Sequence, residues 1–332
     1  REMATLRPSV EAPGPEEKAV TGVAYDSRRT APGDAFVCLA GLEADGHRFA
    51  AAAVRAGAAV VVGERAERPD GTAPVPYVRV DDARRALALL SCELHGHPSR
   101  DLTLTAVTGT NGKSSVNWMV HAIHEEAGWP SAVLGTLGSG TPGVAGGAAG
   151  PLPAVPLRSG PHTTPEAPEL QAELSRWRAA GLRAGAIEAS SHGLALRRTY
   201  GTRFACVVFT NLTVDHLDFH GTVDAYREAK SLLFRREERG VNEPPAAAVV
   251  NADDPAADAV LRGSSDRVLR FGRGAGAQIR PRACELTPRG IRLRVAHPGG
   301  EQEIRSPLLG AFQLDNLLAA FAAGLALGID PE

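Results

Sequence analysis

The chain has few cysteines and no excess of charge of either sign. Its 332 residues include 36 Lys and Arg against 38 Asp and Glu, which gives a formal net charge of -2 at pH 7. A general nucleic-acid-binding protein is normally clearly basic, so this balance argues against a nucleic-acid partner. The four cysteines form no C-x-x-C pair and lie far apart, at Cys38, Cys92, Cys206 and Cys284. This spacing is typical of reduced thiols in a cytosolic protein, and not of a disulfide framework or a zinc site.

The sequence also lacks a long hydrophobic run and a signal peptide. No uninterrupted apolar run approaches the ~20 residues that span a membrane, and the start at Arg1-Glu2-Met3 has no signal-peptide pattern. We therefore expect a cytoplasmic protein without a membrane partner, with a monomer as the default state. The unusual start and the end at Glu332 predict a trimmed chain, and the length is enough for two ordinary domains or more.

What the sequence does contain is a glycine-rich turn between a predicted strand and a predicted helix. The turn reads V-T-G-T-N-G-K-S-S over residues 107–115. Gly109 and Gly112 let the backbone turn sharply, so that the N–H groups of the loop, which includes Thr110 and Asn111, can converge on phosphate oxygens. The start of the following helix adds the positive end of its dipole.

Two side chains after the second glycine suit ATP. Lys113 supplies a positive charge for the terminal phosphates, and Ser114 supplies a hydroxyl for Mg²⁺. The usual P-loop pattern has glycine where this chain has Val107, so G-T-N-G-K-S is a shorter variant. The alternative interpretation is a plain strand-to-helix turn with a surface lysine, but the flanking strand and helix favour the phosphate loop.

Strands alternate with helices on both sides of a break near Pro98, which predicts two α/β domains, 1–98 and 99–332. In the first domain strands are expected at 20–25, 35–39 and 58–63, and helices at 47–56 and 81–95. Asp81 or Asp82 is available as the N-cap of the last of these helices.

The second domain has the pattern of a doubly wound, largely parallel sheet with helices on both faces. Strands are predicted at 102–107, 131–134, 184–187, 205–210 and 246–250, and helices at 114–127, 166–180 and 224–235. Residues 139–161 are rich in Gly, Pro and Ala and predict a mobile loop. Ligands bind such sheets at the carboxyl ends of the strands. Glu188, Asn211 and Asn251 each follow a strand, so they should line one crevice with the phosphate loop.

The pattern changes beyond Gly272. We expect an antiparallel meander with strands at 278–282, 290–296 and 301–306, followed by an apolar helix at 313–328. The fold class is therefore α/β: a small N-terminal α/β domain, and a central P-loop NTPase-like sheet with a small antiparallel extension.

Two polar segments follow strands of the second domain. Glu188 opens E-A-S-S-H-G, and its carboxylate can reach Mg²⁺, which prefers oxygen ligands; the alternative is a capping segment with a solvated glutamate. Residues 210–220 hold two acids and two histidines, including His216, in one loop. Their spacing is not that of a structural zinc site, so Mg²⁺ beside a nucleotide fits better. A structural polar turn is the alternative.

A threonine pair and a second lysine are less telling by themselves. Thr163 and Thr164 precede Pro165 at a predicted helix start, where a plain N-cap is the default and an anionic substrate the alternative. Lys230 lies in the predicted helix 224–235, where a solvated surface side chain is the default interpretation.

In series, these segments resemble a known family. The strongest are Y-D-S-R-R-T-A-P-G-D-A-F-V-C-L-A-G, A-D-G-H-R-F, T-G-T-N-G-K-S-S, H-T-T-P-E, E-A-S-S-H-G-L and F-T-N-L-T-V-D-H-L-D-F-H-G-T-V-D-A-Y-R-E-A-K-S-L-L-F, followed by V-N-A-D-D-P and G-A-F-Q-L-D-N. Over almost its whole length the chain resembles the Mur ligases, the ATP-dependent amide ligases of peptidoglycan precursor synthesis. It is most similar to the MurE branch, which adds the third amino acid to UDP-MurNAc-L-Ala-D-Glu.

The resemblance implies three groups of binding residues, and places Lys113, Lys230, Glu188 and His216 in catalysis. ATP would be held by Gly109, Thr110, Asn111, Gly112, Lys113, Ser114, Ser115 and, near the base, Asn316. The UDP-MurNAc-dipeptide would contact Ser27 and Arg28 at its UDP end, and Thr163, Thr164, Ser190 and Arg198 at its muramoyl-dipeptide end. Mg²⁺ would be bound by Ser114, Glu188, His216 and Lys230, the last as a carbamate formed from a neutral amine and CO₂.

The reaction implied is a two-step ligation. The γ-phosphoryl of ATP passes to a substrate carboxylate, and the amine of an incoming amino acid then attacks the acyl phosphate and releases phosphate. Because two anions must approach each other, positive groups have to neutralise them.

The chain departs from the family at three places. Ser114-Ser115 replaces the usual Thr-Thr but keeps both hydroxyls, whereas Gln313 stands where the family usually has Asn. The family's third domain, which selects the amino acid, is expected to be absent from this sequence. The acceptor thus stays open among meso-diaminopimelate, lysine and others, and we expect weak or no ligation by this chain alone.

Two alternatives to a cell-wall ligase stay open. One is a related amide ligase of another pathway, such as secondary metabolism; the D-S-R segment argues against the folylpolyglutamate branch. The other is a non-catalytic relative that binds a nucleotide or a muropeptide.

Overall fold

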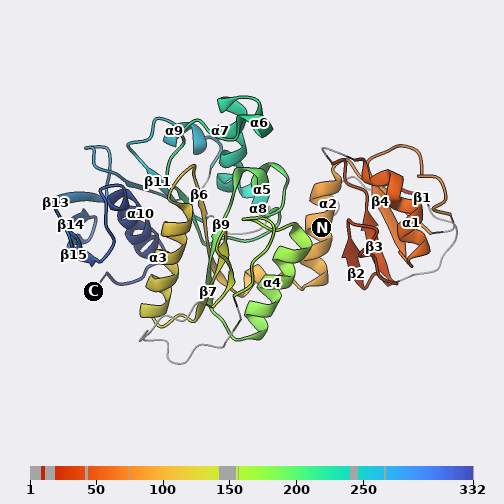
Figure 1. Ribbon diagram of the computed structural model, residues 1–332, viewed down its shortest axis with the longest axis horizontal. Coiled ribbons are helices and arrows are strands. Elements are labelled where there is room, and N and C mark those ends of the chain that lie inside the picture. The colour runs from red at the N-terminus through yellow and green to blue at the C-terminus, as the bar shows by residue number, and fades with distance from the viewer. Residues whose placement is uncertain are drawn as a thin grey trace. The chain divides into compact units, whose positions relative to one another are not determined.

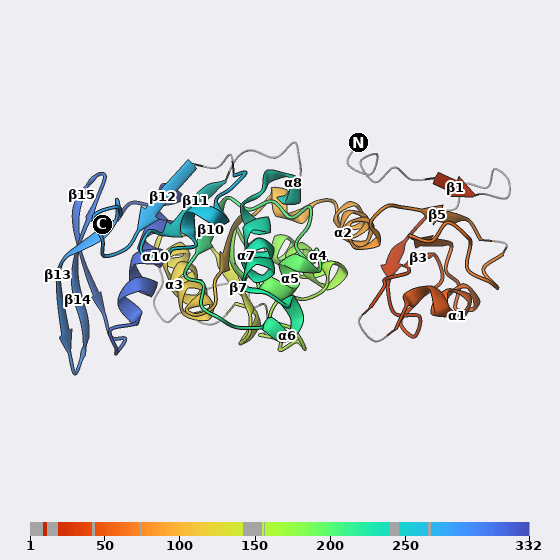
Figure 2. The same ribbon diagram turned by 90° about the horizontal axis from the view of Figure 1, so that it is seen from above.

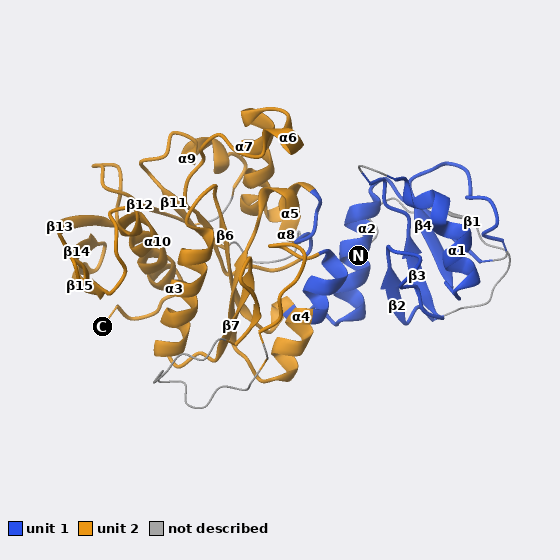
Figure 3. Ribbon diagram, viewed as in Figure 1, with its two compact units in different colours: residues 1–98, 166–172, 196–201 blue, residues 99–165, 173–195, 202–332 orange. Residues whose placement is uncertain are grey.

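The computed structural model describes residues 9–11, 19–41, 44–73, 75–141, 155, 157–239, 246–264 and 267–331 (Figure 1). The chain divides into two compact units, coloured separately in Figure 3. The first unit consists of Arg1–Pro98, Glu166–Ala172 and Leu196–Gly201. The second unit consists of Ser99–Pro165, Glu173–Ala195 and Thr202–Glu332.

The first unit is built on a five-stranded sheet in the order β1-β5-β4-β3-β2. Its strands are Ser9–Glu11 (β1), Gly22–Ala24 (β2), Asp34–Val37 (β3), Val60–Gly63 (β4) and Tyr77–Arg79 (β5). Neighbouring strands run parallel, except that β1 is antiparallel to β5. The three strands predicted for this region are confirmed as β2, β3 and β4.

Each face of this sheet has its own helix, because strand side chains point alternately to the two faces. Phe36 of β3 packs in a cluster with residues of α1 (Ala50–Arg55), which follows the 3-10 turn η2 (Gly46–Phe49). Its neighbour Val37 packs in a second cluster with residues of α2 (Ala83–Leu94). Asp82 caps α2 by accepting a hydrogen bond of 2.9 Å from the Arg85 N–H, as one of the two predicted N-caps.

The second unit contains the predicted, largely parallel sheet, in the strand order β12-β11-β10-β6-β9-β7-β8. The strands are Thr103–Thr108 (β6), Ser131–Gly135 (β7), Gly138–Gly140 (β8), Ala184–Glu188 (β9), Cys206–Phe209 (β10), Ala247–Asn251 (β11) and Arg267–Phe271 (β12). Only the edge pair β7–β8 is antiparallel. Neither β5 nor β12 was predicted, because β5 has only three residues and β12 carries two arginines that obscure a hydrophobic pattern. β8 overlaps the start of segment 139–161, which was predicted to be a mobile loop, and Ser139 and Thr141 bond to Arg158 and Val155 from its other end, so the prediction is wrong for these residues. Residues 142–154 and 156 of that segment lie outside the described residues.

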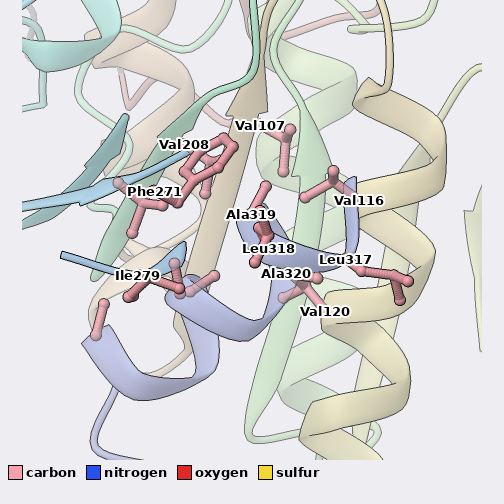
Figure 4. Close-up of a cluster of buried hydrophobic side chains, with 14 of the residues drawn as sticks. Val107, Val116, Val120, Val208, Phe271, Ile279, Leu317, Leu318, Ala319 and Ala320 are labelled. Atoms are coloured by element: carbon pink, nitrogen blue, oxygen red, sulfur yellow. The ribbon is translucent and has the colours of Figure 1, made fainter. Parts of the chain in front are cut away.

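Helices cover both faces of this sheet, as predicted. On one face, α3 (Lys113–Glu126) and α10 (Gln313–Ala326) form a core with Val107 and Val208 (Figure 4). On the other face lies α4 (Ala167–Ala179): a Cβ atom at Gly185 would lie 2.5 Å from the ring of Trp177.

Beyond its first turn, α10 is apolar around its circumference because it is covered on two sides. The antiparallel meander of Arg280–Thr287 (β13), Gly290–His297 (β14) and Gly300–Ser306 (β15) lies beside it in both views (Figures 1 and 2). Alternate residues of β14, Ile291, Leu293 and Val295, belong to the same core cluster as α10. A helix that is hydrophobic on all sides is one that is buried.

The remaining elements are short and connect the larger ones. They are η3 (Pro98–Arg100), α5 (Ser191–Ala195), α6 (Leu217–His220), α7 (Val223–Ser231), η4 (Leu232–Phe234), α8 (Arg236–Arg239) and α9 (Ala257–Val260). In the part of the chain that the structure describes, no helix has the length and apolar character needed to cross a membrane.

Replacing Leu318 by alanine should destabilise the second unit by about 2–5 kcal/mol, because Leu318 is fully buried in the α10 core. Urea unfolding followed by tryptophan fluorescence would measure this, since all three tryptophans, Trp118, Trp129 and Trp177, lie in the second unit. Leu309→Ala is the matched control, because Leu309 is exposed; it should change the free energy of unfolding by less than about 0.5 kcal/mol. Equal effects of the two variants would contradict the assignment of this core.

Candidate functional site

The phosphate loop has a backbone that only glycine fits at two positions. Gly109 (φ +151°) follows β6, and Gly112 (φ +85°) is the N-cap of α3. A Cβ atom at Gly109 would overlap the hydroxyl of Thr210, and one at Gly112 would overlap the side-chain oxygen of Asn316. The loop therefore packs closely against the end of β10 on one side and against the first turn of α10 on the other.

An asparagine pair fastens the tip of this loop to the neighbouring strand. The Asn111 N–H donates to Asn211 Oδ1 at 2.9 Å, and Asn211 Nδ2 donates back to the Asn111 carbonyl at 3.1 Å. The Thr110 N–H bonds to the Asn211 carbonyl at 2.8 Å. These contacts fix the position of the loop, and Ser114 and Ser115 are partly exposed in the first turn of α3.

Lysine is scarce in this chain, and two of its lysines meet at one atom of the loop. The sequence contains only Lys18, Lys113 and Lys230. Lys113 Nζ donates to the carbonyls of Gly109 (3.0 Å) and Thr110 (2.9 Å), and Lys230 Nζ donates to the same Gly109 carbonyl at 2.8 Å. The structure therefore brings these two predicted residues together from two different helices.

The environment of the two amines disfavours two positive charges. Lys230 is 1% exposed; burial, and then the charge of Lys113, lower its pKa well below the ordinary value, against a smaller opposing effect of Asp215. Burial also lowers the pKa of Lys113, while Glu188 and Asp215 act to raise it. The more buried of the two, Lys230, is the one best suited to be a neutral amine.

Tyr226 supports Lys230 and was not found by sequence reasoning. Its ring lies 4.4 Å from Lys230 Nζ, and its hydroxyl is 3.1 Å from the hydroxyl of Thr110. Tyr226 precedes Lys230 by four residues in α7, so the two share one face of the helix. The four-residue spacing of an aromatic residue and a lysine in a predicted helix is the sequence pattern that could have identified Tyr226 as a partner of Lys230.

Glu188 ends β9 at the same edge of the sheet. It is 1% exposed, and Thr136 donates to both of its carboxylate oxygens, through the N–H to Oε1 (3.1 Å) and through the hydroxyl to Oε2 (3.2 Å). Asn251 Nδ2, at the end of β11, donates to the Thr210 carbonyl at the end of β10. Glu188, Asn211 and Asn251 thus lie at the edge of the sheet that carries the loop, as predicted, and that they line one crevice stays a prediction. Thr136, by contrast, had no signal in the sequence.

Three predicted substrate residues gather around Glu188. The Thr164 hydroxyl donates to the Glu188 carbonyl at 2.7 Å and accepts from the Ser190 N–H at 2.9 Å. The hydroxyls of Thr164 and Ser190 are 3.1 Å apart, and that of Thr163 lies 3.1 Å from the Thr136 hydroxyl. Thr163 and Thr164 are therefore more than a helix cap, because both hydroxyls bond to other residues of the site. The helix α4 itself begins later, at Ala167.

His216 lies in an exposed, left-handed turn at the start of α6 (φ 52°, ψ 32°). Its ring centroid is 4.9 Å from that of His192 and 6.1 Å from that of Tyr226. Nearby, burial is the main cause that lowers the pKa of His220 to about 4, with contributions from His192, Lys230 and His216. Among the residues that the structure describes, no group of three or more His, Cys, Asp or Glu side chains could hold a metal ion. Glu188 and His216 therefore do not form such a group with a third residue of these types.

Asn316 reaches the loop from α10, as its expected role requires. It is buried, its Oδ1 lies against Gly112, and its Nδ2 donates to Gln313 Oε1 at 2.9 Å. Gln313, which replaces the usual asparagine, therefore orients Asn316.

The other predicted substrate residues belong to the first unit. Ser27 and Arg28 lie in a turn after β2, where the exposed Arg28 pairs with Asp26 at 2.7 Å. Arg198 is buried and pairs with Glu166 at 2.8 Å.

Comparison with known proteins gives matches over most of the chain. The family model for the Mur ligase middle domain matches residues 107–324, and the model for the Mur ligase family, catalytic domain, matches residues 19–94. The UDP-N-acetylmuramoyl-L-alanyl-D-glutamate–2,6-diaminopimelate ligase of Gloeobacter violaceus is 41% identical over 314 residues, which are 94% of this chain and 60% of that protein. The UDP-N-acetylmuramyl-tripeptide synthetase of Deinococcus radiodurans is 37% identical, over 98% of this chain and 64% of that protein.

A solved structure gives the same result. That of a UDP-N-acetylmuramoyl-L-alanyl-D-glutamate–2,6-diaminopimelate ligase superposes with a TM-score of 0.77 at 28% identity, over 93% of this chain and 60% of that one. The chain thus spans about three fifths of the length of these relatives. The middle-domain match covers well over half of the chain and begins at its phosphate loop. The chain therefore belongs to the Mur ligase family.

Proposed function

We propose that this chain forms the substrate-binding and ATP-binding parts of a MurE-type ligase. The protein would use ATP to add the third amino acid to UDP-MurNAc-L-Ala-D-Glu in peptidoglycan precursor synthesis. The observation that carries the proposal is the convergence of Lys113 and Lys230 on the Gly109 carbonyl of a phosphate loop. The names of the relatives support 2,6-diaminopimelate as the added amino acid.

Each unit would have a separate task. The domain at 1–98 would bind the UDP end of the substrate through Ser27 and Arg28. The domain at 99–332 would bind ATP through the loop, with Asn316 near the base. Thr163, Thr164 and Ser190, together with Arg198, would hold the muramoyl-dipeptide.

The chemistry of the loop follows from charge. A carboxylate must attack the γ-phosphorus of ATP and displace ADP to form the acyl phosphate, so two anions have to approach each other. The loop N–H groups and the start of the α3 dipole would stabilise the phosphates. Lys113 would leave its two carbonyl partners and place its charge on the terminal phosphates. The amine of the incoming amino acid would then attack the acyl phosphate at carbon, form the amide bond and release phosphate.

A magnesium site would fit beside the loop. Ser114, Glu188 and a carbamate on Lys230 offer oxygen atoms, which Mg²⁺ prefers, and His216 offers one nitrogen. The buried Glu188 carboxylate supports this fit, because a buried charge is retained only where it is paired or hydrogen-bonded. The ion would supply positive charge to the transferring phosphoryl group.

A carbamate on Lys230 follows from the state of its amine. A neutral amine can attack the carbon of CO₂ and release a proton to solvent, which leaves an anionic N-carboxylate. Burial and the charge of Lys113 both favour the neutral form of Lys230. Lys230 would thereby change from a donor to the Gly109 carbonyl into a ligand for a cation.

Calorimetric titration of the 332-residue chain with UDP-MurNAc-L-Ala-D-Glu tests the substrate assignment, with UDP-MurNAc-L-Ala as the matched control. The dipeptide form should bind about tenfold more tightly or better, because charge-assisted hydrogen bonds to the extra glutamate contribute roughly 1.5–3 kcal/mol. Equal affinities would contradict the MurE-type assignment. Binding of ADP without either muropeptide would favour a specialised ligase or a non-catalytic relative.

Lys113→Ala should weaken ADP binding at least about tenfold, because the variant loses a charge-assisted contact to phosphate. The melting temperature should stay close to that of the wild type, since the Gly109 carbonyl keeps its hydrogen bond from Lys230 Nζ when the Lys113 side chain is removed. Lys18→Ala makes the same change outside the loop and should bind ADP normally. Unchanged ADP affinity in Lys113→Ala would count against the phosphate-loop assignment.

In ¹³C-bicarbonate, NMR should show one protein carbamate resonance, and Lys230→Arg should lose it. A pKa below the ordinary value means that Lys230 becomes neutral at a lower pH than a free lysine, so the signal should grow as pH rises through that lowered pKa. Lys113→Ala should weaken the signal at a given pH, because removing its charge raises the pKa of Lys230. Lys18→Ala is the control, and a signal that survives Lys230→Arg would rule out the carbamate.

A further inference from the structure

Thr136 lies between two parts of the site, the Glu188 carboxylate and the Thr163 hydroxyl, and its own hydroxyl contacts both. It follows β7, whose partner in the sheet is β9, the strand that ends at Glu188. Gly135 leaves room for the Glu188 side chain, since a Cβ atom at that position would overlap the carboxylate. The Glu188 side chain therefore lies across the end of β7 and meets Thr136.

The two bonds from Thr136 define the plane of the Glu188 carboxylate. The N–H reaches Oε1 at 3.1 Å and the hydroxyl reaches Oε2 at 3.2 Å, so each oxygen has one donor. A carboxylate with both oxygens engaged by one residue has little freedom to rotate about its last torsion angle. Each oxygen still has a lone pair for another partner.

The direction of the hydrogen bonds makes the arrangement a chain. A carboxylate only accepts, so the single hydroxyl proton of Thr136 goes to Glu188. The Thr136 oxygen must then accept from Thr163, whose hydroxyl lies 3.1 Å away. The donor chain runs from Thr163 through Thr136 to Glu188, while Thr164 holds the Glu188 backbone carbonyl.

We propose that Thr136 is a positioning residue of this site. It orients the Glu188 carboxylate toward Mg²⁺ and links that carboxylate to Thr163 at the muramoyl-dipeptide end. The inference rests on the proposed function, in which Glu188 binds the metal and Thr163 the substrate. Thr136 touches neither ligand in this role and acts through the two side chains that do.

The test measures metal binding separately from nucleotide binding. Mn²⁺ serves as the paramagnetic probe for Mg²⁺, and electron paramagnetic resonance of the 332-residue chain with ADP gives its dissociation constant. Thr136→Val keeps the backbone N–H but loses the hydroxyl, and in this variant the dissociation constant for Mn²⁺ should rise about tenfold. This is the lower end of the effect expected for a hydrogen bond to a charged group, because Thr136 is exposed. Metal-free ADP binding should be unchanged.

Two further variants distinguish positioning from a general structural effect. Thr136→Ser restores the hydroxyl and should return Mn²⁺ binding to within about threefold of the wild type. Thr105→Val removes a buried hydroxyl that has no hydrogen-bond partner within the described part of the chain, and it should leave Mn²⁺ binding unchanged. If Thr136→Val does not fold, Thr136→Ala takes its place, because this change only removes side-chain atoms at an exposed position.

The outcomes separate this inference from the function on which it rests. Wild-type Mn²⁺ affinity in Thr136→Val overturns the role of Thr136 alone, as does a Thr136→Ser variant as weak as Thr136→Val. A wild-type chain that binds neither ADP nor UDP-MurNAc-L-Ala-D-Glu overturns the proposed function and this inference together. Calorimetry with the dipeptide substrate adds a second readout, since Thr136→Val should also weaken its binding by removing the partner of Thr163.

Discussion

The geometry of the site depends on a steric constraint at two glycines. Gly109 and Gly112 have positive φ angles, and any side chain at either position would overlap Thr210 or Asn316. Because no side chain intervenes, the backbone comes close enough to β10 and α10 for both to hold it. The same close approach turns the Gly109 carbonyl toward α7, where Lys230 meets it.

Burial of ionisable side chains is the second constraint, and each of these side chains has partners within the site. Glu188 is satisfied by Thr136 from the next strand in the sheet, and Lys230 by the loop carbonyl and the face of Tyr226. A buried ionisable group without such partners would be strongly destabilising. Glu188 and Thr136 lie at strand ends, where the edge of the sheet supplies free backbone groups and access for a ligand, whereas Lys230 reaches the loop carbonyl from α7.

Most of the fold could be predicted, because its elements are periodic and their ends carry local signals. The cap of α2 at Asp82, the helix after the loop and the meander before α10 were all indicated by short-range patterns. β5 and β12 were not, since a three-residue strand and an arginine-bearing edge strand have too little apolar pattern to stand out. Their pairing is decided by neighbours distant in sequence.

The sequence by itself determined the glycine-rich turn between β6 and α3, the edge of the sheet that carries it and the residues that follow each strand. These depend on local backbone preferences and on the rule that ligands lie at the carboxyl ends of parallel strands. Only the tertiary structure decided that Lys113 and Lys230 share one carbonyl, and that Thr136 joins Glu188 to Thr163. Such contacts join residues up to 121 positions apart, and no local preference of the chain encodes which side chains meet at that distance.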